Sequence, residues 1–176
     1  RYLEGKANMD YTIETATADD AEEILALTRI CGAETDNLSY GEEGIPVSVW
    51  QERDYIESVL KSDKDVFFVV RAGQDIVGTA NYSSFPRRRM AHRGEFGLCI
   101  RKSAWGQGIG HALMEKILDF ARNHARSEIV SLEVRSDNER AIKLYQDFGF
   151  KKIGTFEGYF KIDGKLVDFD IMELKL

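Results

Sequence analysis

The stretch KSAWGQGIGHALMEKIL, Lys102–Leu118, decides the fold of this chain because it joins a glycine-rich turn directly to a strong helical pattern. Gly106, Gly108 and Gly110 alternate at the turn. Glycine weakens helices, so its position here indicates either a tight corner or a backbone that must approach another group closely. The helix itself is predicted by apolar residues that recur at helical spacing: Leu113, Met114, Ile117, Leu118 and Ala121.

Two common nucleotide-binding patterns are not met by these glycines. A Walker loop that begins at Gly106 needs glycine at the position that His111 occupies. The dinucleotide pattern GxGxxG fails at His111 when it begins at Gly106, and at Leu113 when it begins at Gly108. A nucleotide-binding domain of either kind is therefore excluded.

A third pattern, [QR]-x-x-G-x-[GA], is met by Gln107, Gly110 and Ala112. A strand is predicted to end near Arg101, and the helix to begin near Gly108 or Ile109. The first N–H groups of a helix have no partner within it, and the helix dipole adds partial positive charge, so such a corner can hold a pyrophosphate. On the motif alone, this interpretation and a plain corner packed with small residues both stay open.

The rest of the chain predicts one mixed α/β (α+β) domain with a mostly antiparallel sheet. Helices interrupt a series of strands in the order β-α-α-β-β-β-α-β-α-β-β, which differs from the regular alternation of a doubly wound fold. The strands are expected at 11–16, 65–72, 75–84, 94–102, 129–135, 151–160 and 165–176, and the helices within 17–31, 48–62, 111–125 and 136–150.

Composition sets further limits. A chain of 176 residues suits one domain, which we place at 9–176, with 1–8 as an N-terminal extension or a cloning remnant. The net charge of −6 argues against a general nucleic-acid surface. PRRRMAHR, 86–93, is interpreted as a solvated hairpin tip, with contact to an anion as the minority alternative. The lack of a signal pattern and of a long apolar run predicts a cytoplasmic protein with no membrane partner.

The cysteines and histidines indicate no metal centre. Cys31 and Cys99 show no CxxC spacing and are expected to be reduced thiols. The three histidines have no metal-ligand spacing. We therefore expect no metal.

GEFGLCIRKSAWGQGIGHALM, followed by LEVRSDNERAIKLYQDFGFKKIG, resembles the core of the GNAT-family N-acetyltransferases. The similarity spans 94–154. The closing segment EGYFKIDGKLVDFDIMELKL, ETD at 34–36 and HRGEFGL before the loop resemble the bacterial branch related to ribosomal-protein N-terminal acetyltransferases. The resemblance implies a GNAT-type sheet with about four flanking helices and a central strand pair, 95–101 and 129–135, that splays apart.

The resemblance also implies acetyl-CoA as co-substrate. The pantetheine arm is then expected to pair with the edge of the first splayed strand at Leu98 and Ile100, beside Cys99, whose thiol we interpret as a buried structural group. Asn138 is expected to cap the last helix and to contact the same arm. The pyrophosphate is expected at the helix start, held mainly by main-chain N–H groups of Gln107, Gly108, Ile109, Gly110, His111 and Ala112.

Catalytic and acceptor residues follow from the same resemblance. Tyr145 lies two helical turns after Asn138 and is expected to protonate or hydrogen-bond the departing CoA thiolate; a core aromatic is the alternative. Glu95 is the first candidate for the general base, directly or through water, with an exposed strand-end glutamate as the alternative and Glu133 as the substitute. Glu34 and Asp36, in the loop between the first two helices, are expected to bind the acceptor amine.

The resemblance therefore implies an N-acetyltransferase that moves an acetyl group from acetyl-CoA to a primary amine, in a small molecule or at a protein or peptide N-terminus. The alternative is a GNAT-like domain that binds or senses acyl-CoA without turnover. Gln107–Ala112 and Tyr145 favour the enzyme. A homodimer is possible, and the acceptor is not specified by the residues because a fold does not fix function.

Overall fold

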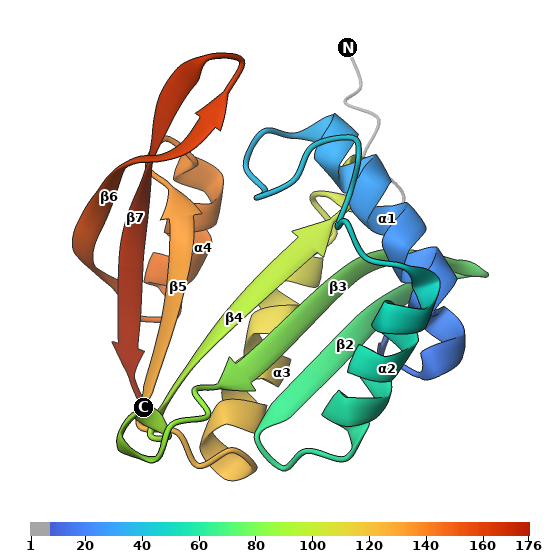
Figure 1. Ribbon diagram of the computed structural model, residues 1–176, viewed down its shortest axis with the longest axis horizontal. Coiled ribbons are helices and arrows are strands. Elements are labelled where there is room, and N and C mark those ends of the chain that lie inside the picture. The colour runs from blue at the N-terminus through green and yellow to red at the C-terminus, as the bar shows by residue number, and fades with distance from the viewer. Residues whose placement is uncertain (1–7) are drawn as a thin grey trace.

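The sheet of this protein is built from segments in which apolar and polar residues alternate. We describe residues 8–176 in a computed structural model, where seven strands follow the order β1-β2-β3-β4-β5-β7-β6 (Figure 1). The strands are β1 Thr12–Thr15, β2 Asp65–Ala72, β3 Asp75–Ser84, β4 Arg93–Ile100, β5 Ile129–Arg135, β6 Lys151–Ile162 and β7 Lys165–Lys175. All neighbouring strands are antiparallel except β4 and β5, which are parallel.

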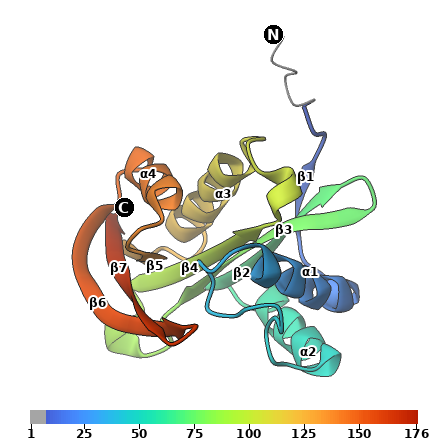
Figure 2. The same ribbon diagram turned by 90° about the horizontal axis from the view of Figure 1, so that it is seen from above.

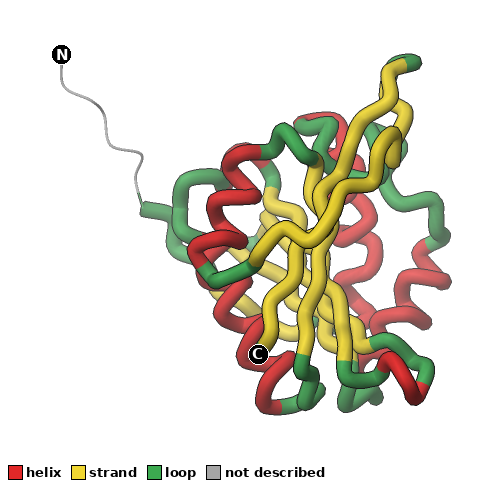
Figure 3. Tube along the Cα trace, turned by 90° about the vertical axis from the view of Figure 1, so that its left-hand side faces the viewer, coloured by secondary structure: helices red, strands yellow, loops and turns green. Residues whose placement is uncertain are grey.

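Four α-helices cover both faces of the sheet (Figures 2 and 3). One face carries α1 Ala21–Glu34 and α2 Val49–Leu60, and the other carries α3 Ile109–Asn123 and α4 Glu139–Asp147. Side chains of the central strands alternate between two cores, so that Val69 packs beneath α1 and α2 while its neighbour Val70 packs beneath α3. The apolar positions predicted for α3 are all buried, which confirms the helical periodicity.

The central strands β4 and β5 pair over a short distance only. Arg93, Gly94 and Glu95 lie opposite residues 129–131, and beyond them no pairing joins the two strands. β4 then continues along β3, while β5 continues along β7. Figure 1 shows the two strands meeting near the C-terminus and diverging toward the opposite end. The splayed pair predicted from the sequence is confirmed.

The closed end of this divergence is fixed by close packing around Gly94. The ring of Tyr82 is fully buried against Gly94, and its hydroxyl hydrogen-bonds the Ser127 hydroxyl. The Ser131 hydroxyl donates to the Gly94 carbonyl, and Arg93 forms an ion pair with Glu173 of β7. These contacts hold β3, β4, β5 and β7 together where the divergence begins.

The predicted element order is confirmed, with local differences. The first helix begins as a 3-10 turn, Ala18–Asp20, and α1 extends to Glu34, so Glu34 belongs to a helix and not to the loop where the sequence placed it. Two further 3-10 turns, Arg88–Met90 and Lys102–Ala104, follow β3 and β4. Within residues 8–176, no helix combines the length and apolarity needed to cross a membrane. The proposed extension 1–8 lies outside the described residues except for its last position.

We predict that Gly94→Ala destabilises the protein by about 1–3 kcal/mol, because an added Cβ would overlap the immobile Tyr82 ring. Urea unfolding measures the loss. Gly97→Ala, in the same strand, is the control, because its Cβ would meet only Asn81 at an ordinary 3.6 Å. Equal unfolding free energies for the two variants would contradict this account of the closed end.

Candidate active site

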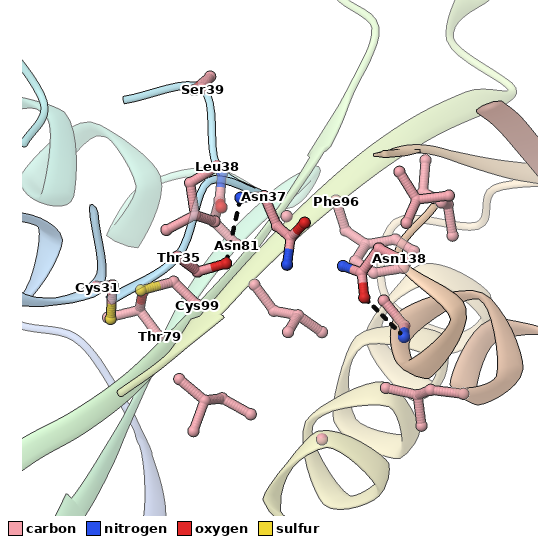
Figure 4. Close-up of a pocket in the computed structure, with 18 of the residues that line it drawn as sticks. Cys31, Thr35, Asn37, Leu38, Ser39, Thr79, Asn81, Phe96, Cys99 and Asn138 are labelled. Atoms are coloured by element: carbon pink, nitrogen blue, oxygen red, sulfur yellow. Dashed lines mark hydrogen bonds between the residues drawn. The ribbon is translucent and has the colours of Figure 1, made fainter. Parts of the chain in front are cut away.

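A cavity of about 1380 Å³ passes through the sheet where β4 and β5 diverge. Residues from both faces line it, including Tyr55 of α2 on one side and His111 of α3 on the other. Figure 4 shows Cys31, Asn81 and Cys99 on one side of the opening and Asn138 on the other. The divergence therefore gives two molecules access to one another from opposite faces of the sheet.

The free edge of β4 presents backbone groups to this opening. The Arg93 carbonyl and the Arg101 N–H both bond to the β3 side, to Phe85 and Val77. Backbone groups of alternate residues point to opposite edges, so those of Leu98 and Ile100 face the gap. The Ile100 carbonyl already accepts the Trp105 indole N–H at 2.7 Å. An extended ligand can therefore pair with Leu98 and with the Ile100 N–H.

The glycine-rich turn owes its sequence to two different constraints. Gly106 and Gly108 have φ angles of +77° and +79°, and no atom lies within 4 Å of where a Cβ would stand. This left-handed backbone disfavours other residues, and the space in front of it is open. Gly110 has another role, since an added Cβ would lie 3.2 Å from Leu144 Cδ2 of α4.

The start of α3 forms a potential anion site. Gly108 is its N-cap residue and no side chain caps the helix, so its first N–H groups are open to a ligand. Arg140 and Lys143 of α4 also line the cavity, and Lys143 pairs with Asp147 at 3.3 Å. Arg140 also lies over the Trp105 ring, 4.8 Å from its centroid, which connects the turn to α4. Helix dipole and cations together favour phosphate here.

Only part of the predicted pyrophosphate site lines the cavity. Gly108, Ile109, Gly110 and His111 line it, whereas Gln107 and Ala112 do not. The Gln107 carboxamide accepts the Met9 N–H at 2.9 Å, and the Ala112 N–H bonds to the Gly108 carbonyl within the helix. Gln107 and Ala112, at the two ends of the motif, therefore make contacts that hold the turn and the start of the helix.

Asn138 and Tyr145 lie as their spacing suggested. Asn138 Oδ1 accepts the Ala141 N–H at 3.3 Å and caps α4, while the residue lines the cavity (Figure 4). Tyr145 is 8% exposed, and its ring packs edge-on against Phe96 and Phe150. Burial raises the pKa of Tyr145 to about 12, so the phenol stays protonated at neutral pH. Its hydroxyl has no hydrogen-bond partner in the described part of the chain.

Three titratable side chains meet near the closed end of the divergence. Glu95 and Glu133 line the cavity from β4 and β5. Partial burial and the negative charge of Glu133 raise the pKa of Glu95 above its ordinary value. A hydrogen bond to Glu133 also raises the pKa of Tyr159, which approaches from β6. A glutamate with a raised pKa is suited to accept a proton near neutral pH.

The face beneath α1 and α2 contributes polar side chains that sequence reasoning missed. Tyr55 is close enough to Ser83 and Asn81 for their polar groups to oppose the rise of its pKa that burial causes, and these two β3 residues lie directly opposite Glu95 and Gly97. Glu52, one helical turn before Tyr55, also lines the cavity. The sequence offered one signal, because Glu52 lies in a predicted helix three residues before Tyr55, whose place in the apolar pattern was uncertain. Only the fold brings Tyr55 beside β3.

Glu34 and Asp36 are close to the cavity but do not line it. The Glu34 carboxylate accepts the Lys102 N–H at 2.6 Å and ties the end of α1 to the turn after β4. The Asp36 carbonyl accepts from Arg135 at 3.3 Å, which joins the loop to the end of β5. Their neighbours Thr35 and Asn37 line the cavity instead (Figure 4). The amine contacts assigned to these two side chains remain a prediction.

Cys99 is part of the packing beneath α1. Its thiol is buried beside Cys31, and Thr79 lies opposite it on β3. A hydrogen bond to Cys99 and burial raise the pKa of the Cys31 thiol. This surrounding agrees with a structural thiol. Within residues 8–176, no group of three or more metal-ligating side chains is found.

Comparison with known proteins places this geometry in context. The family model "Acetyltransferase (GNAT) family" matches residues 8–150. The L-amino acid N-acetyltransferase AaaT of Escherichia coli is 31% identical over 120 residues, 68% of this chain and 71% of that protein. The N-alpha-acetyltransferase RimI of Mycobacterium tuberculosis is 30% identical over 145 residues, 80% of this chain and 85% of that protein.

A solved structure agrees with these sequence relatives. The crystal structure of a GNAT-family acetyltransferase from Streptococcus pneumoniae superimposes with a TM-score of 0.90 at 26% identity. The match covers 95% of this chain and 99% of that one.

We predict that Gly108→Ala lowers the free energy of unfolding by about 1–2 kcal/mol, because alanine must adopt a left-handed backbone, and that it weakens binding of acetyl-CoA. Gly73→Ala is the matched control, since Gly73 also has a positive φ and open surroundings but lies in the β2–β3 turn. It should cost similar stability and leave binding unchanged. Calorimetric titration measures both affinities, and an equal loss in the two variants would count against the anion site.

Proposed function

The chain belongs to the acetyltransferase (GNAT) family, and from this premise we propose that it is an acetyl-CoA-dependent N-acetyltransferase acting on a primary amine. The resemblance identified in residues 94–154 is confirmed by the family model. The match to an N-alpha-acetyltransferase over most of the chain agrees with the branch that we identified. The acceptor belongs to a small molecule or to a protein or peptide N-terminus.

The cavity that crosses the sheet is the observation that carries this proposal. Its α3–α4 side offers helix N–H groups, open space at two glycines and two cations, which suit a pyrophosphate. The free edge of β4 at Leu98 and Ile100 suits an extended arm that pairs as an added strand. These features fit acetyl-CoA, which when bound supplies an activated thioester to the centre of the opening.

Glu95 and Tyr145 are the side chains that we propose for proton transfer. The acceptor amine must lose a proton before its nitrogen can bond to the acetyl carbon, and the raised pKa of Glu95 on the cavity wall supports it as the group that takes this proton, directly or through water. As the carbon–sulfur bond breaks, the sulfur needs a proton or a hydrogen bond. Tyr145 is protonated at neutral pH and its hydroxyl has no other described partner, so it is suited to supply one.

A domain that binds acyl-CoA without turnover is the competing function. The two are separated by measuring free thiol after mixing the protein with acetyl-CoA and a panel of amines. Release of thiol together with acetylated product supports the enzyme. Tight acetyl-CoA binding with no thiol release across peptide N-termini, polyamines, aminoglycosides and amino acids would establish the binding domain.

We predict that Tyr145→Phe lowers kcat by on the order of 10²-fold while the affinity for acetyl-CoA stays close to that of the wild type. The aromatic packing against Phe96 and Phe150 is kept, so stability should change little. Steady-state kinetics and calorimetry provide the two measurements. An unchanged kcat would remove Tyr145 as proton donor.

For Glu95→Gln we expect a loss of kcat on the order of 10²-fold. Because its pKa is raised, the wild-type carboxylate forms above the ordinary glutamate range and activity rises as pH increases through that pKa. The variant loses most at pH values between the pKa of Glu95 and that of the acceptor amine, where the wild-type carboxylate is formed and the acceptor is still protonated. Glu115→Gln, on the exposed face of α3, is the control. Parallel pH–rate profiles for wild type and Glu95→Gln would exclude Glu95 as base.

A further inference from the structure

Glu52 is a buried residue on the cavity wall whose carboxylate has no partner among the described residues. Its side chain lines the cavity from α2, and the residue is 6% exposed. Among residues 8–176, it forms neither a hydrogen bond nor an ion pair. The neighbouring cation Arg53 pairs with Asp19 and donates to the Ala18 carbonyl. The fold therefore holds an acidic group in a buried position without using it.

Such a position is costly unless a cation completes it. Burying an unpaired carboxylate is strongly unfavourable, and burial alone raises the pKa of Glu52. A capping box at Ser48 and Gln51 fixes the start of α2 and thereby the place of Glu52 one residue later. A carboxylate that is held firmly on a cavity wall and has no partner among residues 8–176 suits a ligand that carries a positive charge.

Glu52 and Glu95 belong to the same wall of the cavity. Tyr55 lies one helical turn after Glu52 and reaches Ser83, which is directly opposite Glu95 in the β3–β4 register. The elements α2, β3 and β4 thus place both carboxylates on one wall of the cavity, with Tyr55 and Ser83 on the same wall. Apolar Ile24 and Phe67 line the cavity on this same face.

The charged side chains that line this wall are acidic. Glu52, Glu95 and Glu133 line the cavity, and the basic side chains that line it, His111, Arg140 and Lys143, all come from α3 and α4 on the opposite face. Arg101 is a cation on the α1–α2 side, where its charge acts on the Cys31 thiol. The three carboxylates favour a cationic acceptor.

Resting on the proposed function, we propose that the acceptor is a linear diamine or polyamine, with one amine acetylated near Glu95 and a second, as ammonium, paired with Glu52. The methylene chain between the two amines suits Ile24 and Phe67, because it carries no polar group past them.

The test compares four acceptors under saturating acetyl-CoA: hexamethylenediamine, n-hexylamine, ε-aminocaproate and an alanine-initiated peptide. The three small acceptors each carry a primary amine on a six-carbon chain and differ in the group at the other end, and rates for the diamine are divided by two because both of its amines can react. We expect KM for the diamine to be at least about tenfold below that for hexylamine, the change expected for one charge-assisted hydrogen bond. The aminocaproate should be the poorest small acceptor. Equal KM values for diamine and hexylamine, or preference for the peptide, would overturn the proposal.

Glu52→Gln provides the matched variant. It should raise KM for the diamine toward that of hexylamine and leave hexylamine itself almost unaffected. It should also raise Tm, because it removes a buried charge, so a general folding defect is not expected. Glu57→Gln, on the exposed side of α2, is the control and should change neither value. An equal rise in KM for both amines would show that Glu52 holds no distal ammonium.

Binding separates this inference from the proposed function. If no amine is acetylated, calorimetric titration of hexamethylenediamine into the CoA-bound protein still measures the pairing. Tighter binding by the wild type than by Glu52→Gln supports the ammonium site even without turnover. Equal binding overturns the site whether or not other amines are acetylated.

Discussion

The arrangement of this protein depends on the loss of pairing between β4 and β5 after three residues of each strand. Parallel strands normally continue side by side, and here they diverge just beyond Gly94, where a buried tyrosine occupies the space that a side chain would need. Each strand keeps its other neighbour, so the sheet remains whole on both sides. An opening through the sheet results, with unsatisfied backbone groups on the β4 edge and the N-termini of α3 and α4 beside it.

The two faces of this opening differ in the kind of interaction they offer. The α3–α4 face provides backbone N–H groups, glycines with left-handed conformation and two cations. The α1–α2 face provides carboxylates, amide and hydroxyl groups held by strand register and by Tyr55. The first face depends on backbone shape and the second on side-chain identity. The proposed donor and acceptor roles follow this difference.

The same difference explains how much could be predicted from the sequence. The turn at Gly106–Gly110 and the helix after it are local, since spacing within some twenty residues determines them, and Asn138 and Tyr145 are two turns of one helix apart. The element order and the splayed pair followed from these patterns and the family resemblance. The reason for glycine at position 110 was harder to predict, because a side chain there would come too close to Leu144 on another helix.

The residues on the α1–α2 side of the cavity could not be predicted from the sequence, for a physical reason. Glu52, Tyr55 and Ser83 come from elements that meet only in the folded sheet, and no short motif joins them. Glu34 was assigned to a loop because its segment is polar and contains glycine. In the structure α1 extends to Glu34, whose carboxylate accepts a hydrogen bond from the Lys102 N–H. Asp36 contributes its carbonyl, a group that residue type does not reveal.

The placement of the basic lining residues on α3 and α4 has a consequence for the order of events in the proposed reaction. Arg140, Lys143 and the start of α3 attract a phosphate-bearing donor to their side, where Glu139 and Asp147 also line the cavity, and the carboxylates of the opposite wall attract a cationic acceptor. Each reactant therefore has its own route, and neither has to wait for the other to pass. Excess acceptor does not obstruct the donor's mouth, and the two products can depart in either sequence.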